Sequence, residues 1–146
     1  GKVEQGYLRR IVLRERDKPG GLAPALIFQT AMFALEHQYH TIVEGILHSA
    51  RYSDMITSLR RRCPGPSFVF YLDACWAETI RRHATRPEAD AFTPEHMRDW
   101  YISQDLLGFD DEHVIPESST LEETIAAIAA ITGLPLAGGN DDFWAR

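Results

Sequence analysis

The chain has 146 residues, of which 45% are hydrophobic and 25% charged, a composition that suits one globular domain with a buried core. Its net charge of −6 argues against a general nucleic-acid binder, which normally carries a basic face. No apolar run approaches the ~20 residues that a membrane span requires, and no signal peptide is visible. We therefore expect a cytoplasmic protein without a membrane partner, in which Cys63 and Cys75 stay reduced.

The first half of the chain alternates short apolar runs with helical patterns. In chain order we expect a strand end at 3–5, a short helix at 7–14, a long helix at 22–37, a buried strand at 40–46 and a helix at 49–62. The helix at 22–37 is apolar nearly all the way round. Such a helix is either buried on two sides or uses one side to bind a partner, so a homodimer through it is one expectation.

The strongest strand pattern of the chain covers residues 68–72. This run is continuously apolar, which predicts a strand covered on both faces. A helix at 75–84 follows it. Another helix is expected to begin at Pro94, because Thr93 is a favoured N-cap residue and proline is favoured at the first helical position.

The C-terminal part carries one more strand and one more helix. The strand is expected at 113–115, and Ser119 with Glu122 is expected to form a capping box for the helix that Gly133 closes. We expect a single domain over residues 1–136 and a flexible tail over residues 137–146.

Strands that alternate with helices predict an α/β fold with a parallel sheet sandwiched by helices. Ligands in such sheets bind beyond the carboxyl ends of the strands. Glu44 and Asp73 each end an expected strand, so the functional site is expected at the edge that they share.

Glu44 is the first candidate for chemistry, because an acid at a strand end can orient Mg²⁺ through water or accept a proton from a hydroxyl. The alternative is a carboxylate at the positive end of the following helix. Gly45 would allow a ligand or another chain to approach closely. Asp73 is expected to cap the helix that follows it.

Arginines form the second group of candidates. Arg82 and Arg86 have the i, i+4 spacing of one helix face, so both could converge on a phosphate chain; the alternative is an exposed face on which Glu78 pairs with Arg82. Arg9 and Arg51 follow strand ends and could hold an anionic or polar substrate. The six histidines are scattered, and no residue is assigned as a metal ligand.

Several segments together resemble a bacterial family of small P-loop kinases, ATP-dependent phosphotransferases similar in layout to chloramphenicol phosphotransferase and the kinase half of polynucleotide kinase. The resemblance covers most of the chain. The segments are VEQGYLRR (3–10), IVEGILHSARYSDM (42–55), FYLD (70–73), ETIRRHATRP (78–87) and VIPESSTLEET (114–124).

The resemblance implies a kinase that uses ATP and Mg²⁺ to phosphorylate a hydroxyl of a small molecule. It implies that Arg82 and Arg86 are lid arginines over the phosphates and that Glu44 lies near Mg²⁺ and the substrate. Residues 116–120, with Ser118 among them, would lie near the adenine. Tyr7, Arg9 and Arg51 would face the substrate.

The sequence departs from this family at two places. The glycine-rich GxxxxGK[ST] loop and its strand, which lies at the centre of the family's sheet, are missing, and Gly6 stands where relatives carry a catalytic Asp. We therefore expect an open seam in the sheet, which a further segment or subunit fills. The alternative function is a catalytically inactive nucleotide-fold domain that binds or dimerises.

Overall fold

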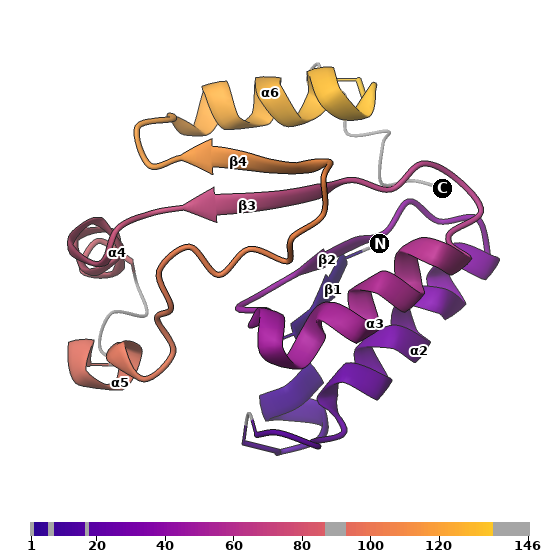
Figure 1. Ribbon diagram of the computed structural model, residues 1–146, viewed down its shortest axis with the longest axis horizontal. Helices are drawn as coiled ribbons and strands as arrows, with labels where there is room; N and C mark the ends of the chain where they lie inside the picture. Colours follow the sequence, from indigo (N-terminus) through magenta and orange to yellow (C-terminus); the bar gives the residue numbers. More distant parts are fainter. Residues whose placement is uncertain (1, 6–7, 17, 87–92, 136–146) are drawn as a thin grey trace. The chain divides into compact units, whose positions relative to one another are not determined.

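The computed structural model describes residues 2–5, 8–16, 18–86 and 93–135. Its contacts divide the chain into two compact units, which are described in turn (Figure 1). Unit 1 comprises residues 1–67 and 92–110, and unit 2 comprises residues 68–91 and 111–146. The single domain expected over residues 1–136 stays a prediction, and the tail at 137–146 lies outside the described residues. None of the helices in the described ranges has the length and apolar character needed to cross a membrane.

Unit 1 is built on two short parallel strands, β1 (Lys2–Glu4) and β2 (Ile42–Glu44), in the register Val3↔Val43. Its two long helices are α2 (Ala23–Glu36) and α3 (Ser49–Arg62). Arg60, Arg61 and Arg62 end α3, where cations complement the negative end of a helix.

Two short helices complete unit 1. The first expected helix is a π-helix, η1 (Leu8–Val12). The other is α5 (Pro94–Arg98), where Thr93 is the N-cap and its side chain accepts from the backbone N–H of His96, so the predicted cap is confirmed.

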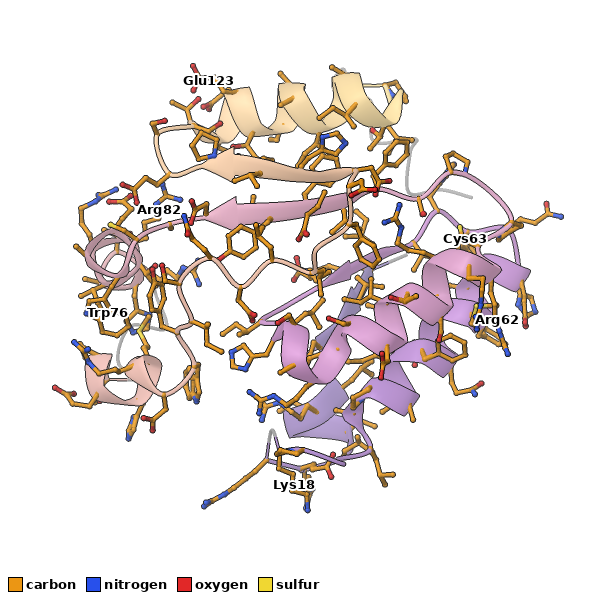
Figure 2. The ribbon with its side chains drawn as sticks, viewed as in Figure 1. Lys18, Arg62, Cys63, Trp76, Arg82 and Glu123 are labelled. Atoms are coloured by element: carbon orange, nitrogen blue, oxygen red, sulfur yellow. The ribbon has the colours of Figure 1, made fainter. Side chains whose placement is uncertain are left out.

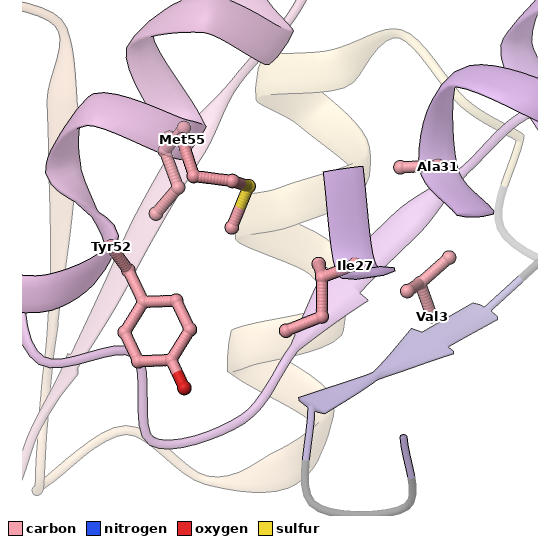
Figure 3. Close-up of a cluster of buried hydrophobic side chains, with 6 residues drawn as sticks. Val3, Ile27, Ala31, Tyr52 and Met55 are labelled. Atoms are coloured by element: carbon pink, nitrogen blue, oxygen red, sulfur yellow. The ribbon is translucent and has the colours of Figure 1, made fainter. Parts of the chain in front are cut away.

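The core of unit 1 lies between α2, α3 and β1 (Figure 3). Tyr52 and Ile27 are its largest fully buried side chains. The Tyr52 hydroxyl accepts a hydrogen bond from Nε2 of the buried Gln5 at 2.9 Å, which satisfies both polar groups inside the core. The buried members of this cluster are Val3, Ile27, Ala31, Tyr52, Met55 and Ile56.

Unit 2 contains the second pair of parallel strands, β3 (Val69–Asp73) and β4 (Glu112–Pro116), in the register Tyr71↔Val114. Helix α4 (Trp76–His83) follows β3, and helix α6 (Leu121–Thr132) follows β4. Gly133 ends α6 in the left-handed conformation, which glycine adopts without strain.

The prediction of a mixed α/β fold with parallel strands is confirmed, but the strands form two separate two-stranded sheets. The expectation that the strands are buried is wrong for much of both pairs: Ile42 in β2 is 63% exposed and Leu72 in β3 is 65% exposed. The reason is that each strand has one neighbour within the described part of the chain, so the outer edges and parts of the faces remain uncovered.

For helix α2, the structure contradicts one of the two expected alternatives, burial on two sides. Its buried residues, Ala23, Ile27 and Ala31, lie on one side, whereas Phe33 is 64% exposed and its ring lies 4.3 Å from that of His37. The helix is therefore buried along one stripe rather than on two sides. A homodimer through this helix stays a prediction.

Two predicted caps are wrong. The capping box of α6 is Thr120 with Glu123, one residue later than the Ser119 and Glu122 pair. Asp73 is not the N-cap of α4, because β3 runs on through Asp73 and the helix starts only after Cys75.

Candidate functional site

The arginines of α4 in unit 2 are held by one carboxylate. Nε and Nη2 of Arg81 donate to the two oxygens of Glu78 at 2.7 Å each, and Nε of Arg82 donates to Oε1 of the same residue at 2.5 Å. The i, i+4 pair of Glu78 and Arg82 is the arrangement that the sequence offered as the alternative to a phosphate-facing pair.

Arg82 also reaches the loop that follows β4. Its Nη2 donates to the backbone carbonyl of Glu117 at 2.6 Å (Figure 2). The side chain of Glu117 in turn accepts from the backbone N–H of Cys75, the N-cap of α4, at 2.8 Å. Both ends of α4 are therefore tied to this loop, in which Ser118 is exposed. The structure thus brings together Arg82 and residues 116–120, two elements that the resemblance assigns to one nucleotide.

The charges of this cluster largely compensate one another. Hydrogen bonds from Arg81 and then from Arg82 lower the pKa of Glu78 from its usual value near 4.5 to about 2. Hydrogen bonds from Cys75 lower the pKa of Glu117. Both carboxylates are ionised at neutral pH, so a phosphate that approaches Arg82 competes with Glu78 for the same guanidinium.

Arg86 does not share a helix face with Arg82. Helix α4 ends at His83, and the chain turns so that the backbone N–H of Arg86 donates to the carbonyl of His83 at 3.0 Å. The sequence contains the reason, because Pro87 disfavours helical geometry in the residue before it. Arg86 is exposed beyond the helix, so the condition for a shared helix face, a helix that extends to Arg86, is not met.

Glu44 in unit 1 lies at the end of β2, as predicted, and forms an ion pair with Lys2 across the sheet. The distance between Lys2 Nζ and Glu44 Oε1 is 2.7 Å, and both side chains are about half exposed. Water screens such a pair, and the half-exposed carboxylate of Glu44 is in contact with solvent. The alternative expectation was that Glu44 stabilises the start of α3. In the structure Asp105 has this role, because it accepts the hydrogen bond of the Ser49 backbone N–H.

Asp105 holds the first turn of α3 from a distant part of the sequence. Its Oδ2 accepts from the backbone N–H of Ser49 at 3.0 Å, and its Oδ1 accepts from the Ser49 hydroxyl at 2.5 Å. The preceding residue, His48, is buried and its Nε2 contacts the carbonyl oxygen of Trp100 at 2.8 Å. These contacts span 52 to 56 residues of sequence, so no local pattern could have revealed them.

Arg51 lines a cavity at the start of α3. Its Nη2 contacts Nδ1 of His48, and both residues border a cavity of about 360 Å³ together with Lys18, Ala50 and Ile102. Arg51, which was predicted to face a substrate, therefore borders a cavity. Nothing in the sequence indicated that Lys18 borders the same cavity, because its loop carries no motif.

Arg9 and Tyr7 are the other two residues predicted to face the substrate. Arg9 in η1 is half-buried; its Nη1 donates weakly to the carbonyl of Glu15 at 3.4 Å, and its Nε is buried without a hydrogen-bond partner. Arg9 lines neither the cavity beside Arg51 nor a second cavity, which residues 13–16, Lys18 and Leu22 border. Tyr7 lies outside the described residues.

Within the described ranges, no three His, Cys, Asp or Glu side chains come together as a metal site. Comparisons with models of known families, with characterised proteins and with solved structures find no match to this chain.

Proposed function

We propose that the protein is an ATP-dependent kinase that transfers the γ-phosphoryl group to a hydroxyl of a small molecule. The observation that supports this proposal best is the hydrogen bond from Arg82 to the backbone of Glu117. It joins a cationic helix end to an exposed loop, and both lie at the carboxyl ends of parallel strands, where α/β folds bind their ligands. The resemblance to small P-loop kinases assigns these same two elements to the nucleotide.

The residues of unit 2 fit a bound nucleotide in their chemistry. Arg82 would hold a phosphate oxygen, and Ser118 with the neighbouring loop backbone offers donors and acceptors for the base. Binding requires Arg82 to exchange part of its pairing with Glu78, which is possible because Arg81 can keep that carboxylate paired. Arg86, exposed after the helix, is the second lid arginine that the resemblance implies.

A magnesium ion bound with ATP would neutralise charge on the transferring phosphoryl group. Proteins commonly hold this ion through one or two carboxylates, with phosphates and water as the other ligands. Glu44 is a carboxylate of this kind, exposed at a strand end. The resemblance alone assigns Glu44 to the site of the nucleotide, where it would orient a metal-bound water or accept the proton of the acceptor hydroxyl.

The second candidate is a nucleotide-fold domain that binds without catalysing. Gly6, which stands in the position of the family's catalytic acid, favours it, because glycine cannot accept a proton from the acceptor hydroxyl. The two candidates share nucleotide binding and differ in turnover.

Titration of the protein with ATP, with and without Mg²⁺, tests the proposal by calorimetry. Arg82→Gln should weaken ATP binding by about tenfold, because it removes a charge-assisted hydrogen bond. Arg81→Gln is the matched control: it also loses an ion pair with Glu78 but leaves the Glu117 contact in place. Equal effects of the two variants, or no binding at millimolar ATP, would overturn the proposal.

ADP formation in the presence of a panel of hydroxyl compounds separates the two candidates. The kinase requires acceptor-dependent ADP formation that Glu44→Gln reduces. ATP binding without any turnover would leave the non-catalytic domain as the function.

A further inference from the structure

We propose that Glu78 and Glu117 form an autoinhibitory clasp in unit 2, which holds the Arg82 guanidinium against its own helix, α4, and which a phosphate chain must open to bind. The hydrogen bonds of this clasp all lie within unit 2. Its effect on ATP rests on the proposed kinase function, because the clasp would regulate the nucleotide site of that function. The closed clasp would keep the affinity for ATP below the value that a released Arg82 would give.

The first argument is the position of the Arg82 side chain. Side chains of a helix tilt towards its N-terminus, and Nε of Arg82 donates to Oε1 of Glu78, one turn earlier, at 2.5 Å. Its Nη2 donates to the carbonyl of Glu117 at 2.6 Å. The atoms Nε and Nη2 form one edge of the planar guanidinium, an edge with which arginine can bind an oxyanion through two parallel hydrogen bonds. The clasp therefore occupies both donors that a phosphate would need at this edge.

The second argument is that Glu117 binds both ends of α4. Its carboxylate accepts from the backbone N–H of Cys75, the N-cap of this eight-residue helix, while its carbonyl accepts from Arg82 in the last turn. A carboxylate is favoured at the positive end of a helix, so this bond keeps the Glu117 carbonyl in reach of the arginine. The two bonds are coupled, because loss of the Arg82 bond leaves the loop attached to α4 through the Cys75 bond alone.

The third argument is the charge of Glu78. Its carboxylate is ionised at neutral pH, and its side chain is 18% exposed, whereas that of Arg82 is 43% exposed and can be reached from solvent. Arg81 donates two hydrogen bonds to Glu78, so the carboxylate stays in place when Arg82 leaves. Glu78 therefore opposes a phosphate in two ways: it competes for the same donors, and it repels the bound anion as a like charge.

Calorimetric titration of ATP into the wild-type protein and Glu78→Gln tests the clasp. Glutamine keeps the size of the side chain and removes its charge, so Glu78→Gln should bind ATP about fivefold more tightly, the factor for one partly exposed ion pair. A merely structural role of Glu78 predicts the opposite sign, because a helix that loses its ion pairs would hold the nucleotide less well. Glu122→Gln removes an exposed carboxylate of α6 and should leave the affinity unchanged, which controls for net charge.

Hydrogen exchange of the Cys75 amide in the wild-type protein is the second measurement. Bound ligands usually slow exchange, whereas opening of the clasp should make ATP accelerate it at this amide. If Glu78→Gln does not fold, this measurement decides the question, and exchange that ATP does not accelerate would overturn the proposal.

The titration separates the clasp from the kinase function. ATP binding by the wild-type protein that Glu78→Gln leaves equal or weakens would overturn the clasp and retain the kinase. Absence of ATP binding by both proteins would remove the kinase function and the clasp together.

Discussion

Gly45 combines a positive φ with a close contact of its backbone, so both its conformation and its surroundings favour glycine. Its φ of +144° lies in a region that other residues rarely adopt, and a Cβ at this position would lie 2.7 Å from Cβ of Gln5. Gln5 cannot move away freely, because it is buried and donates to Tyr52. The residue that approaches Gly45 closely is thus Gln5, which follows β1, and not a ligand or another chain as predicted.

Gly45→Ala should lower the free energy of unfolding by about 1–3 kcal/mol, the usual cost of a strained backbone conformation, with a further cost from the overlap with Gln5. Urea unfolding followed by circular dichroism measures this change. Gly65→Ala is the control, because Gly65 has no atom near its Cβ position and no positive φ. A Gly45 variant as stable as the Gly65 variant would contradict the packing described here.

Glu78 makes the stability of unit 2 depend on pH. Its pKa falls from about 4.5 to about 2 on folding, because Arg81 and Arg82 donate hydrogen bonds to its ionised form. A lowered folded pKa means that the contribution of Glu78 is complete above pH 4.5 and is lost as the pH falls through 2. Glu78→Gln should therefore flatten the loss of helical circular dichroism between these two pH values. An unchanged acid transition in this variant would contradict the pairing.

At the scale of elements, the helix boundaries were largely predictable from the sequence, whereas the caps were predictable only in part: Thr93 and Gly133 cap their helices as predicted, and the N-caps of α4 and α6 differ. The ends of α3 agree with the prediction because a proline–glycine segment follows it and a basic turn closes it. In α6, both Ser119 and Thr120 are suitable N-cap residues and both are followed three residues later by Glu. Local pattern cannot choose between them, since the choice depends on where β4 and its turn end.

Thr120→Ala should destabilise α6 by about 1 kcal/mol, because the Thr120 hydroxyl accepts from the Glu123 backbone N–H and the Glu123 carboxylate accepts from that of Thr120. Ser119→Ala should cost less, since its hydroxyl bonds to the side chain of Thr124 and, at 3.4 Å, to the carbonyl of Thr120, and accepts from no backbone N–H of the first turn. Thermal unfolding of the two variants compares them. A larger loss for Ser119→Ala would restore the capping box predicted from the sequence.

The candidate site was predictable from the sequence only where local spacing determines the position of a residue. Glu44 is where its strand pattern puts it, and the pairing of Arg82 with Glu78 follows from helical spacing. The i, i+4 spacing of Arg82 and Arg86 would give one helix face only in a helix longer than α4, and Pro87 disfavours helical geometry at Arg86. The bonds of His48 and Ser49 to residues 100 and 105 depend on tertiary structure, which sequence spacing does not encode.

At the scale of the whole molecule, the two units differ in how much core they have. The buried cluster of unit 1 has six members, whereas Ile115 is the one buried hydrophobic residue among those of unit 2 that the structure describes. Large apolar side chains of unit 2 remain exposed, including Leu72, Leu121 and Ile125. Burial of apolar surface is the main source of stability, so unit 2 is expected to be the less stable part.

Native-state hydrogen exchange should show this difference directly. Amides of α2 and α3 should exchange at free energies near that of global unfolding, whereas amides of β3 and β4 should exchange through a lower-energy local opening. Ile27→Ala, in the core of unit 1, should lower the protection of α2 and α3 by about 2–5 kcal/mol. Protection of β3 and β4 equal to that of α2 and α3 would show that unit 2 is stabilised by more than the contacts described here.

The bonds from His48 and Ser49 to Trp100 and Asp105 also determine when unit 1 can be completed during synthesis. Residues 1–67 leave the ribosome first, but the first turn of α3 lacks its partners until residues 100–105 have emerged. Closing a loop of about fifty residues costs chain entropy that a local contact does not. A nascent chain that stalls between Ser67 and Trp100 would therefore hold α3 with an unanchored N-terminus, and the cavity beside Arg51 would form only late in translation.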